Sequence, residues 1–323
     1  MRAHFTNPGF REEATNEFRR ALDYIYQQLE RTPGGFAQDE VARFLHGGDE
    51  RFGYPSREEI ETLTTEEAKA WLETDLDTGY LEVTVVGSFE KETALASLAK
   101  TLGNLPERSD TKPEYAAERV VKFPEATSKV FEFDSEIPKG MAVVHWPTTH
   151  IYDIKTSRRL GMLSAILDDR LRVKVREELG DAYSPFAHNL PSDTWQEYGY
   201  LFATVTVDPE QGESVTKVIS EIAAAQAPRE SITEDELERA KKPQVTSIEE
   251  MRRTNRYWRG SVLESSQEYP ERLEWSRSFV EDYKSITRDE VNQLAKEYLS
   301  EDKKVSVIIR PTVSENMEET SEE

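Results

Sequence analysis

Apolar residues recur at helical spacing in two distant segments, and an alternating run follows each of them. The first helix is predicted to begin at Thr64 and the second at Thr287, in both cases with a glutamate three residues later. This spacing is typical of a capping box, in which the two side chains satisfy backbone N–H groups at a helix start. Tyr80–Gly87 and Lys304–Ile309 follow, and their β-branched alternation predicts a strand after each helix.

The recurrence predicts a duplicated unit. The helix start repeats after 223 residues and the strand after 224, which indicates a divergent repeat of about 200 residues or more. The second copy ends near Thr312, so it would begin close to residue 110, after the polar, proline-bounded stretch Leu105–Pro113. By the same count the first copy would begin before Met1. We therefore expect a truncated domain at 1–109, a complete domain at 110–313 and a disordered acidic tail at 314–323.

Strands and helices are predicted in separate blocks within the second copy. The strands are expected at Glu118–Phe123, Lys129–Phe133, Met141–Trp146, Ala182–Asn189 and Tyr198–Val207, and the helices at Ile154–Glu178, Gln211–Ala225, Thr233–Leu263 and Tyr269–Phe279. In the strand that ends at Val207, Tyr200 and Phe202 are expected to face away from Leu201 and Ala203. This arrangement predicts an α+β fold with an antiparallel or mixed sheet and helices packed against it.

Composition narrows the classes of function. The 323 residues carry 41 Lys plus Arg and 63 Asp plus Glu, a formal charge of −22 that disfavours a nucleic-acid partner. The absence of cysteine excludes disulfides, thiolate metal sites and a cysteine nucleophile. No apolar run approaches the length of a membrane span, and no targeting signal is recognisable at the N-terminus, so no membrane partner is predicted.

The histidines do not follow a metal-binding pattern. Five are present, at His4, His46, His145, His150 and His188, and none belongs to a zinc-binding helix motif. The serine-hydrolase and phosphate-binding loop motifs are also absent from the sequence. The basic, aromatic run from Arg252 to Trp258 is more typical of a half-buried helix, with Met251, Tyr257, Trp258 and Val262 inward, than of a binding patch. We therefore predict no metal site and no catalytic residue in this chain.

One helix-to-strand corner has an unusual arrangement of side chains. Arg176 lies near the end of the predicted helix Ile154–Glu178, and Tyr183 lies at the start of the next strand. A guanidinium and a phenol that converge at one corner can both donate to peptide carbonyls. The alternative is a purely structural role, with basic residues at a helix C-terminus, a capping Gly180 and a packed tyrosine ring.

Two stretches resemble a known protease family. Val83–Glu92, followed by a helix and Leu102–Pro106, is similar to the strand, helix and exit of a domain in pitrilysin/insulinase-type zinc metallopeptidases, and Arg176–Tyr183 resembles the same family. In that family, homologous α+β domains form two halves that close over a peptide. The helix containing Asn255 and Trp258 is similar to bacterial four-domain members.

The resemblance implies a non-catalytic half of such an enzyme. The family's zinc-binding His-x-x-Glu-His helix has no match here, so zinc and its chemistry would belong to an N-terminal catalytic half of the same polypeptide. The chain would then enclose peptide substrate, with Arg176 and Tyr183 holding the substrate backbone, and would be inert alone. The resemblance also implies a periplasmic or secreted location. The alternative is a non-catalytic scaffold or interaction protein with the same fold.

Overall fold

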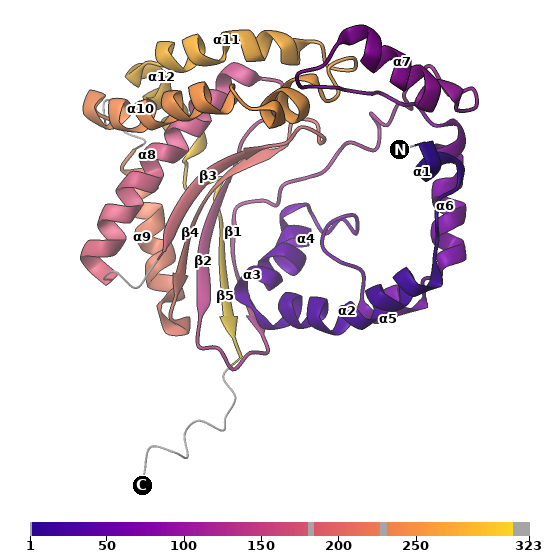
Figure 1. Ribbon diagram of the computed structural model, residues 1–323. Helices are drawn as coiled ribbons and strands as arrows, with labels where there is room; N and C mark the ends of the chain where they lie inside the picture. Colours follow the sequence, from indigo (N-terminus) through magenta and orange to yellow (C-terminus); the bar gives the residue numbers. More distant parts are fainter. Residues whose placement is uncertain (1, 180–183, 227–230, 313–323) are drawn as a thin grey trace. The chain divides into compact units, whose positions relative to one another are not determined.

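The computed structural model describes residues 2–179, 184–226 and 231–312 (Figure 1). The chain divides into two compact units, each built from segments that are distant in sequence. The first unit contains residues 1–25, 55–118 and 247–279, and the second contains residues 26–54, 119–246 and 280–323. The two units are defined by their compactness and not by a sequence repeat. The domain limits expected from the repeat therefore stay a prediction.

The second unit contains a five-stranded mixed sheet. Its strands are β1 (Thr127–Phe133), β2 (Gly140–Pro147), β3 (Pro185–Pro191), β4 (Gly199–Val207) and β5 (Val305–Pro311), in the order β1-β5-β2-β4-β3. Among the strand pairs that the structure describes, only β1–β5 is parallel, with Thr127 opposite Val305. The other described pairs are antiparallel, with Val143 of β2 between Thr204 of β4 and Val307 of β5. The predicted α+β class is confirmed.

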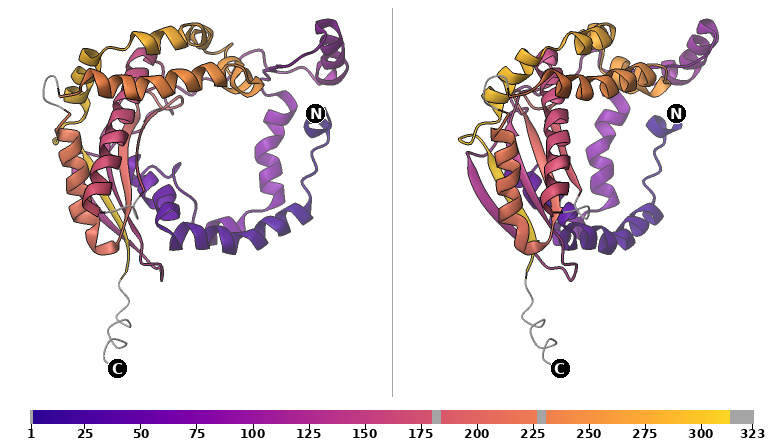
Figure 2. Two further views of the ribbon diagram at one scale, coloured as in Figure 1. Left: turned by 60° about the vertical axis from the view of Figure 1, so that its left-hand side comes forward. Right: turned by 90° about the vertical axis from the view of Figure 1, so that its left-hand side faces the viewer.

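Helices cover one face of this sheet. They are α8 (Ile154–Leu179), α9 (Gly212–Ala224) and α12 (Arg288–Tyr298), and Figure 2 shows α8 and α9 against the strands. Trp146 and Leu201 point to this side with Leu163 and Leu167 of α8, and all four are almost completely buried. Truncating such a leucine to alanine costs about 2–5 kcal/mol, so this layer contributes strongly to the stability of the unit.

A shorter helical segment packs on the opposite face. It consists of α3 (Pro33–Phe36), the π-helical turn Ala37–Val41 and α4 (Ala42–Leu45), and it follows the long helix α2 (Glu12–Arg31). Phe36 and Phe44 contact the ring of Phe131 on β1, with centroid distances of 5.8 and 5.7 Å. Val41 and Leu45 are buried in the same cluster. The segment therefore packs on the β1 and β5 side of this face.

The first unit is largely helical. It holds α1 (Arg2–Thr6), α5 (Arg57–Thr62), α6 (Thr65–Thr78), α7 (Lys91–Thr101), the 3₁₀ turn Leu102–Asn104 and the π-helical turn Tyr257–Leu263. The Arg108 guanidinium donates to the carbonyl oxygens of Asp75, Leu76, Asp77 and Gly79, at 2.6 to 3.0 Å. One side chain thus donates to several carbonyls at the end of α6, while the Thr78 carbonyl accepts from the Ser109 N–H at 2.8 Å.

Both predicted capping boxes are confirmed. Thr64 and Glu67 exchange hydrogen bonds at the start of α6, and Thr287 and Glu290 do so at the start of α12. The strand predicted at Tyr80–Gly87 is wrong, because this stretch is extended but has no strand partner among the described residues. A strand is stabilised by pairing with a neighbouring strand, so the alternation of side chains alone is not enough to predict one. The described residues accordingly contain one sheet, and a repeated domain is not seen in them.

Two further elements differ from the sequence predictions. Glu118–Phe123 forms no strand in the structure. The helix expected over Thr233–Leu263 is divided into α10 (Glu234–Met251) and the π-helical turn that begins at Tyr257. Thr254 explains the break, because its hydroxyl donates to the Met251 carbonyl at 2.8 Å and accepts from the Tyr257 N–H at 3.3 Å. Of the four side chains expected to face inward, Tyr257 and Val262 are buried, Trp258 is half-buried and Met251 is exposed.

The remaining helices are the 3₁₀ turn Pro209–Gln211 and α11 (Glu271–Ser285). Within the described ranges, no helix has the length and apolarity required to cross a bilayer.

Candidate functional site

The open part of the sheet carries aromatic side chains at the β3 end. Phe186 and His188 of β3 share this side with Tyr200 and Phe202 of β4 and with His145 of β2, because alternate residues of paired strands point the same way. We call these five residues the aromatic face. The predicted orientation of Tyr200 and Phe202, opposite to Leu201 and Ala203, is confirmed by the burial of the latter two against the helices.

The rings of the aromatic face contact one another. Phe186 meets Phe202 edge to face at a centroid distance of 5.8 Å and stacks beside His188 at 5.9 Å. Tyr200 meets His145 at 5.5 Å. Phe186 is 49% exposed and His188 is also exposed, while Tyr200 and Phe202 are half-buried. Exposed aromatic surface of this kind can bind apolar side chains of another molecule.

His145 forms the floor of the aromatic face and is neutral at physiological pH. It is 5% exposed, and burial lowers its pKa to about 4, although a hydrogen bond with the Val305 backbone acts in the opposite direction. Burial also raises the pKa of Tyr200. His145 therefore adds no positive charge to the aromatic face near neutral pH, in a chain whose formal charge is −22. The Nδ1 atom of His145 has no hydrogen-bond partner in the structure.

A second aromatic group lies at one end of β4. The ring of His46 stacks on Phe52 at 3.4 Å and on Tyr198 at 4.8 Å, and Phe52 contacts Trp195 at 5.0 Å. The Tyr198 hydroxyl donates to the Leu45 carbonyl at 2.9 Å. These contacts fix the loop after α4 against the turn between β3 and β4. This second aromatic group therefore has a structural role next to the aromatic face.

The edge of β3 is shielded from further strand pairing. The N–H of Ala187 donates to the Asp168 carboxylate of α8 at 3.0 Å, and that carboxylate also accepts from Arg172 at 2.9 Å. By alternation, the residues whose backbone groups point outward with Ala187 include Pro185 and Pro191, which have no N–H to offer. A ligand on the aromatic face would therefore contact side chains rather than extend the sheet at β3.

A hollow of about 560 Å³ adjoins β3 on the side of α8 and α10. Charged residues of its lining pair with one another. Nη2 of Arg239 lies 3.1 Å from Oδ2 of Asp169, and Arg172 pairs with Asp168. Since these charges already have partners within the chain, we assign the hollow a structural role.

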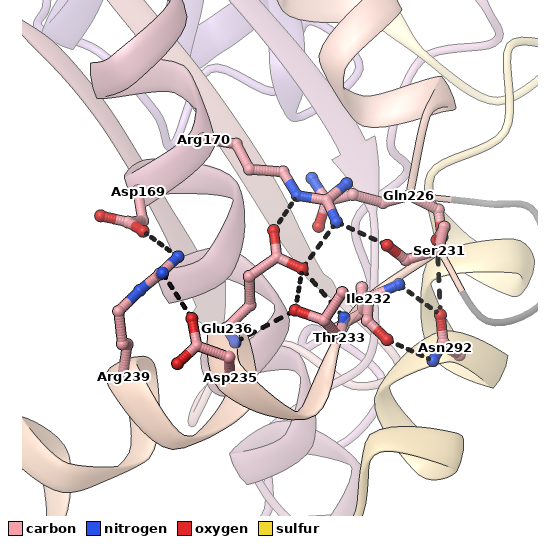
Figure 3. A network of polar contacts seen from close by, with 10 residues as sticks. All are labelled: Asp169, Arg170, Gln226, Ser231, Ile232, Thr233, Asp235, Glu236, Arg239 and Asn292. Atoms are coloured by element: carbon pink, nitrogen blue, oxygen red, sulfur yellow. Dashed lines mark hydrogen bonds and ion pairs between the residues drawn. The ribbon is translucent and has the colours of Figure 1, made fainter.

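A network of polar contacts fixes the start of α10 beside this hollow (Figure 3). Arg170 donates to Glu236 at 2.7 Å and to the Ser231 carbonyl at 2.8 Å. Glu236 in turn accepts from the Thr233 N–H at 2.9 Å, and Asn292 of α12 accepts from the Ile232 N–H at 3.1 Å. The Arg170 hydrogen bond lowers the pKa of Glu236 to about 2, so this carboxylate is ionised throughout the physiological range.

The predicted pair Arg176 and Tyr183 lies beyond what the structure describes. Arg176 belongs to the last turns of α8, but its side chain, like the whole of Tyr183, is outside the described residues. The prediction that the two side chains converge therefore stays a prediction. Phe186 and His188 were not singled out from the sequence. Their strand was predicted, but no local pattern shows which sheet face remains uncovered.

No group of three or more His, Asp or Glu residues with metal-binding geometry occurs within residues 2–179, 184–226 and 231–312. The histidines occupy separate environments: His46 is stacked between rings, His145 is buried under Tyr200, and the His150 ring accepts from the Tyr152 N–H. Tetrahedral zinc requires at least three converging ligands, and these side chains do not fit that requirement.

Comparison with known proteins identifies related folds. The sequence model of the peptidase M16 inactive domain matches residues 62–243. A peptidase M16 inactive domain from Pseudomonas fluorescens has a similar structure, with a TM-score of 0.77, 21% identity, and coverage of 97% of this chain and 74% of that one. A protease from Helicobacter pylori gives a TM-score of 0.76 at 14% identity, covering 93% and 73%. No curated protein matches the sequence.

Two longer proteases also resemble the chain. A mutant of the ferredoxin protease FusC, in complex with Arabidopsis ferredoxin, has a TM-score of 0.72 at 13% identity and is covered over 34% of its length. The periplasmic protease PqqL from Escherichia coli has a TM-score of 0.69 at 18% identity and is covered over 32%. The chain covers 97% and 93% of its own length in these comparisons, so it spans about a third of each protease.

Proposed function

This chain belongs to the peptidase M16 family through its inactive domain, and on that premise we propose that it binds peptide substrate as the non-catalytic half of a zinc-dependent endopeptidase. The match to about a third of FusC and PqqL supports a role as one part of a longer protease. In this proposal the chain is the end of one M16 domain followed by a complete second one, as in bacterial four-domain members. Peptide-bond hydrolysis would occur on the N-terminal catalytic half.

Zinc chemistry would belong to that other half. The described residues offer no converging set of three ligands, so no catalytic step can be assigned to them. Zinc bound elsewhere in the assembled enzyme would activate the attacking water. The contribution of this chain is then to hold the substrate and to exclude water around it.

The aromatic face is the observation that carries the proposal. Its exposed Phe186 ring and uncharged floor suit apolar side chains of an unfolded peptide. Arg176 and Tyr183 precede β3 along the chain, so a peptide on the aromatic face would extend toward the α8–β3 connection. There the guanidinium and the phenol would donate to its backbone carbonyls. Arg176 and Tyr183 would then both bind substrate. The alternative is the purely structural role of a basic helix end and a packed tyrosine ring.

Binding of a fluorescein-labelled, unstructured peptide that contains Phe and Leu residues would test the proposal by fluorescence anisotropy. We expect Phe186→Ala to weaken binding by about 1–2 kcal/mol, roughly five- to thirtyfold in Kd. Phe18→Ala is the matched control, because Phe18 of α2 is 44% exposed and is not part of the aromatic face. Equal effects of the two substitutions, or no binding by the wild-type chain, would count against the aromatic face as the site.

The predicted pair requires a separate measurement in the full-length protease. Arg176→Ala and Tyr183→Phe should each lower kcat/KM by roughly five- to a hundredfold, because a donor to the peptide backbone is removed. The melting temperature should change little. Unchanged turnover together with a large fall in melting temperature would establish the structural alternative instead.

A non-catalytic scaffold remains the second candidate. One observation favours it: the Pseudomonas fluorescens structure with the same fold is described as an inactive domain, and the chain covers 74% of it. Under this alternative the chain would bind an interaction partner without accompanying a catalytic half. An open reading frame that continues upstream into a domain with His-x-x-Glu-His would exclude the scaffold.

A further inference from the structure

The basic run that follows α10 has a packed side and an exposed side. Tyr257 is 4% exposed and Trp258 is half-buried, so the aromatic rings form the packed side. The basic residues of the run are Arg252, Arg253, Arg256 and Arg259, and the last three of them are exposed. We call these four residues the arginine cluster. No acidic residue lies between Met251 and Leu263, although the chain as a whole carries a formal charge of −22.

The guanidinium groups of the arginine cluster have no partner in the part of the chain that the structure describes. None of the four makes a hydrogen bond or an ion pair there. The Nε atom of Arg252 is buried and lacks an acceptor, and a buried donor without an acceptor destabilises a fold. Arg108 and Arg170, by contrast, donate to several acceptors within the chain. The arginine cluster therefore retains its donors for an acceptor on another molecule.

Arg256 and Arg259 lie where a helix disfavours cations. The helical stretch begins at Asn255 and continues as the π-helical turn, whose first turn contains no acidic residue. A helix N-terminus carries a partial positive charge, so cations placed there lower the stability of the helix. Arg252 and Arg253 instead follow the C-terminus of α10, where cations are favourable. The dipole of α10 thus accounts for two members of the arginine cluster, and Arg256 and Arg259 need another explanation.

Hydrogen bonds fix the backbone that carries the arginine cluster. The Trp258 Nε1–H donates to the Arg252 carbonyl at 2.7 Å, and Thr254 links Met251 to Tyr257 as described above. Arg256 and Arg259 are three positions apart on a helix, so their Cβ atoms are about 5–6 Å apart. Alternate residues of an extended peptide are separated by about 6.6 Å. Carboxylates at alternate positions of such a peptide can therefore meet successive arginines.

We propose that the arginine cluster binds a peptide segment rich in Glu or Asp. A guanidinium can donate two parallel hydrogen bonds to one carboxylate, and arginine clusters recognise acidic motifs for this reason. The inference rests on the proposed function, because it names the class of peptide substrate that the chain would bind. Charge complementarity selects this occupant. Salt screens charges beyond about 8–10 Å, so a short acidic segment at the cluster is attracted by four cations and is repelled little by distant acids.

Nucleic acid fits the arginine cluster less well than an acidic peptide. Proteins that bind single strands offer aromatic rings on which the bases stack. Here Tyr257 is buried, and the Trp258 N–H is occupied by the Arg252 carbonyl, so both rings are packed against the protein. A long polyanion would also extend over the rest of a chain whose formal charge is −22, which repels phosphates.

Two labelled peptides separate this inference from the proposed function. Both are unstructured and contain the same Phe and Leu residues, but the Glu peptide carries glutamates at alternate positions where the Gln peptide carries glutamines. Fluorescence anisotropy with the whole chain should give the Glu peptide a Kd that is roughly five- to fiftyfold lower. Equal Kd values would overturn the inference and leave the proposed function standing. Binding of the Glu peptide alone would support the inference and contradict the aromatic face as a site, and binding of neither would overturn both.

Substitution of the arginines tests the location of the site. The double variant Arg256→Gln with Arg259→Gln should weaken binding of the Glu peptide roughly three- to twentyfold and leave binding of the Gln peptide unchanged. Its melting temperature should not fall, because neither guanidinium has a partner in the described structure. The matched control is Arg11→Gln with Arg20→Gln, which removes two exposed arginines elsewhere in the first unit. Equal losses in the two double variants would show that only the overall charge matters, and would overturn the inference.

Salt and a competing polyanion identify the occupant. The difference in Kd for the Glu peptide between the wild-type chain and the Arg256 and Arg259 double variant should shrink as NaCl is raised from about 0.1 to 1 M, because the Debye length falls from about 10 to 3 Å. A difference that stays constant would contradict recognition by charge. Labelled oligothymidylate should bind more weakly than the Glu peptide. Tighter binding of the oligonucleotide through the same arginines would make nucleic acid the occupant and overturn the proposal.

Discussion

The Asp168 carboxylate accepts the N–H of Ala187 at 3.0 Å, and through this contact a side chain of α8 takes the position that a neighbouring strand would otherwise occupy. The same carboxylate accepts from Arg172 at 2.9 Å, one helical turn away. Asp168 thus ties the long helix to the outer strand while it prevents strand addition at β3. The aromatic face remains accessible because this contact lies at the edge of the sheet and not on its face.

Replacing Asp168 with alanine should lower the free energy of unfolding by about 1–3 kcal/mol, because the half-buried N–H of Ala187 loses its acceptor. Asp168→Asn keeps an oxygen acceptor and should cost less. Urea titration of both variants measures the difference. The control is Asp169→Asn, at an adjacent and more exposed carboxylate. A loss in Asp169→Asn as large as that in Asp168→Ala would indicate that the Ala187 contact contributes little.

Acid should weaken the contacts of Glu236. Its pKa is lowered to about 2 in the folded chain, below the ordinary value of 4.5. A carboxylate with a lowered pKa stabilises the fold above its ordinary pKa, and this contribution is lost as pH falls toward the folded value. The difference in free energy of unfolding between wild type and Glu236→Gln should therefore shrink between about pH 5 and pH 2. Urea unfolding at a series of pH values would contradict this if the difference stays constant.

His145 should affect stability in a higher pH range. Its folded pKa of about 4 lies below the ordinary value of 6.5, so the unfolded chain binds the proton first. Protonation of His145 is therefore more favourable in the unfolded chain, and the free energy of unfolding falls as pH falls from about 6.5 toward 4. His145→Phe removes this titration and fits among aromatic neighbours, so the variant should gain stability relative to wild type as the buffer is acidified through this range. His188→Phe is the control, because it places the same ring at an exposed position of the same face. A difference between wild type and His145→Phe that stays constant with pH would contradict the prediction.

Removing the Arg108 guanidinium should loosen the end of α6. The carbonyls at the end of α6 lose the hydrogen bonds that Arg108 donates, so Arg108→Ala should speed hydrogen exchange in the last turn of α6 and lower the melting temperature. The matched variant is Arg277→Ala, at an exposed arginine that pairs with Glu274 on its own helix. Exchange in α6 that is equally slow in both variants would show that water replaces the arginine at no cost.

Sequence motifs predicted the elements that depend on contacts between residues close in sequence. The capping pairs at Thr64 and Thr287 marked two helix starts correctly, since capping involves residues three positions apart. Tyr80–Gly87 has strand composition but no partner in the described structure, and Thr254 breaks a helix that periodicity alone would continue. The hydrophobic periodicity of a segment does not show which strand it pairs with, or whether a side-chain hydrogen bond interrupts its helix.

The candidate site shows the same limit. The alternation that places Tyr200 and Phe202 on one side was readable from the sequence. The exposure of Phe186 was not, because it depends on where Phe36 and Phe44 settle, and these belong to a segment that is distant along the chain. Which face of a sheet stays open is a property of long-range packing.

The place of β5 between β1 and β2 also governs how the protein can be made. Glu132 and Arg310, which pair across β1 and β5, are 178 residues apart. The last described strand therefore enters the middle of the sheet, so β1 and β2 cannot be bridged until β5 has also left the ribosome. Until then their hydrogen-bonding edges stay exposed, and such long-range pairing is intrinsically slow. Folding of this unit should accordingly be slow and should depend on chaperones that protect the incomplete sheet.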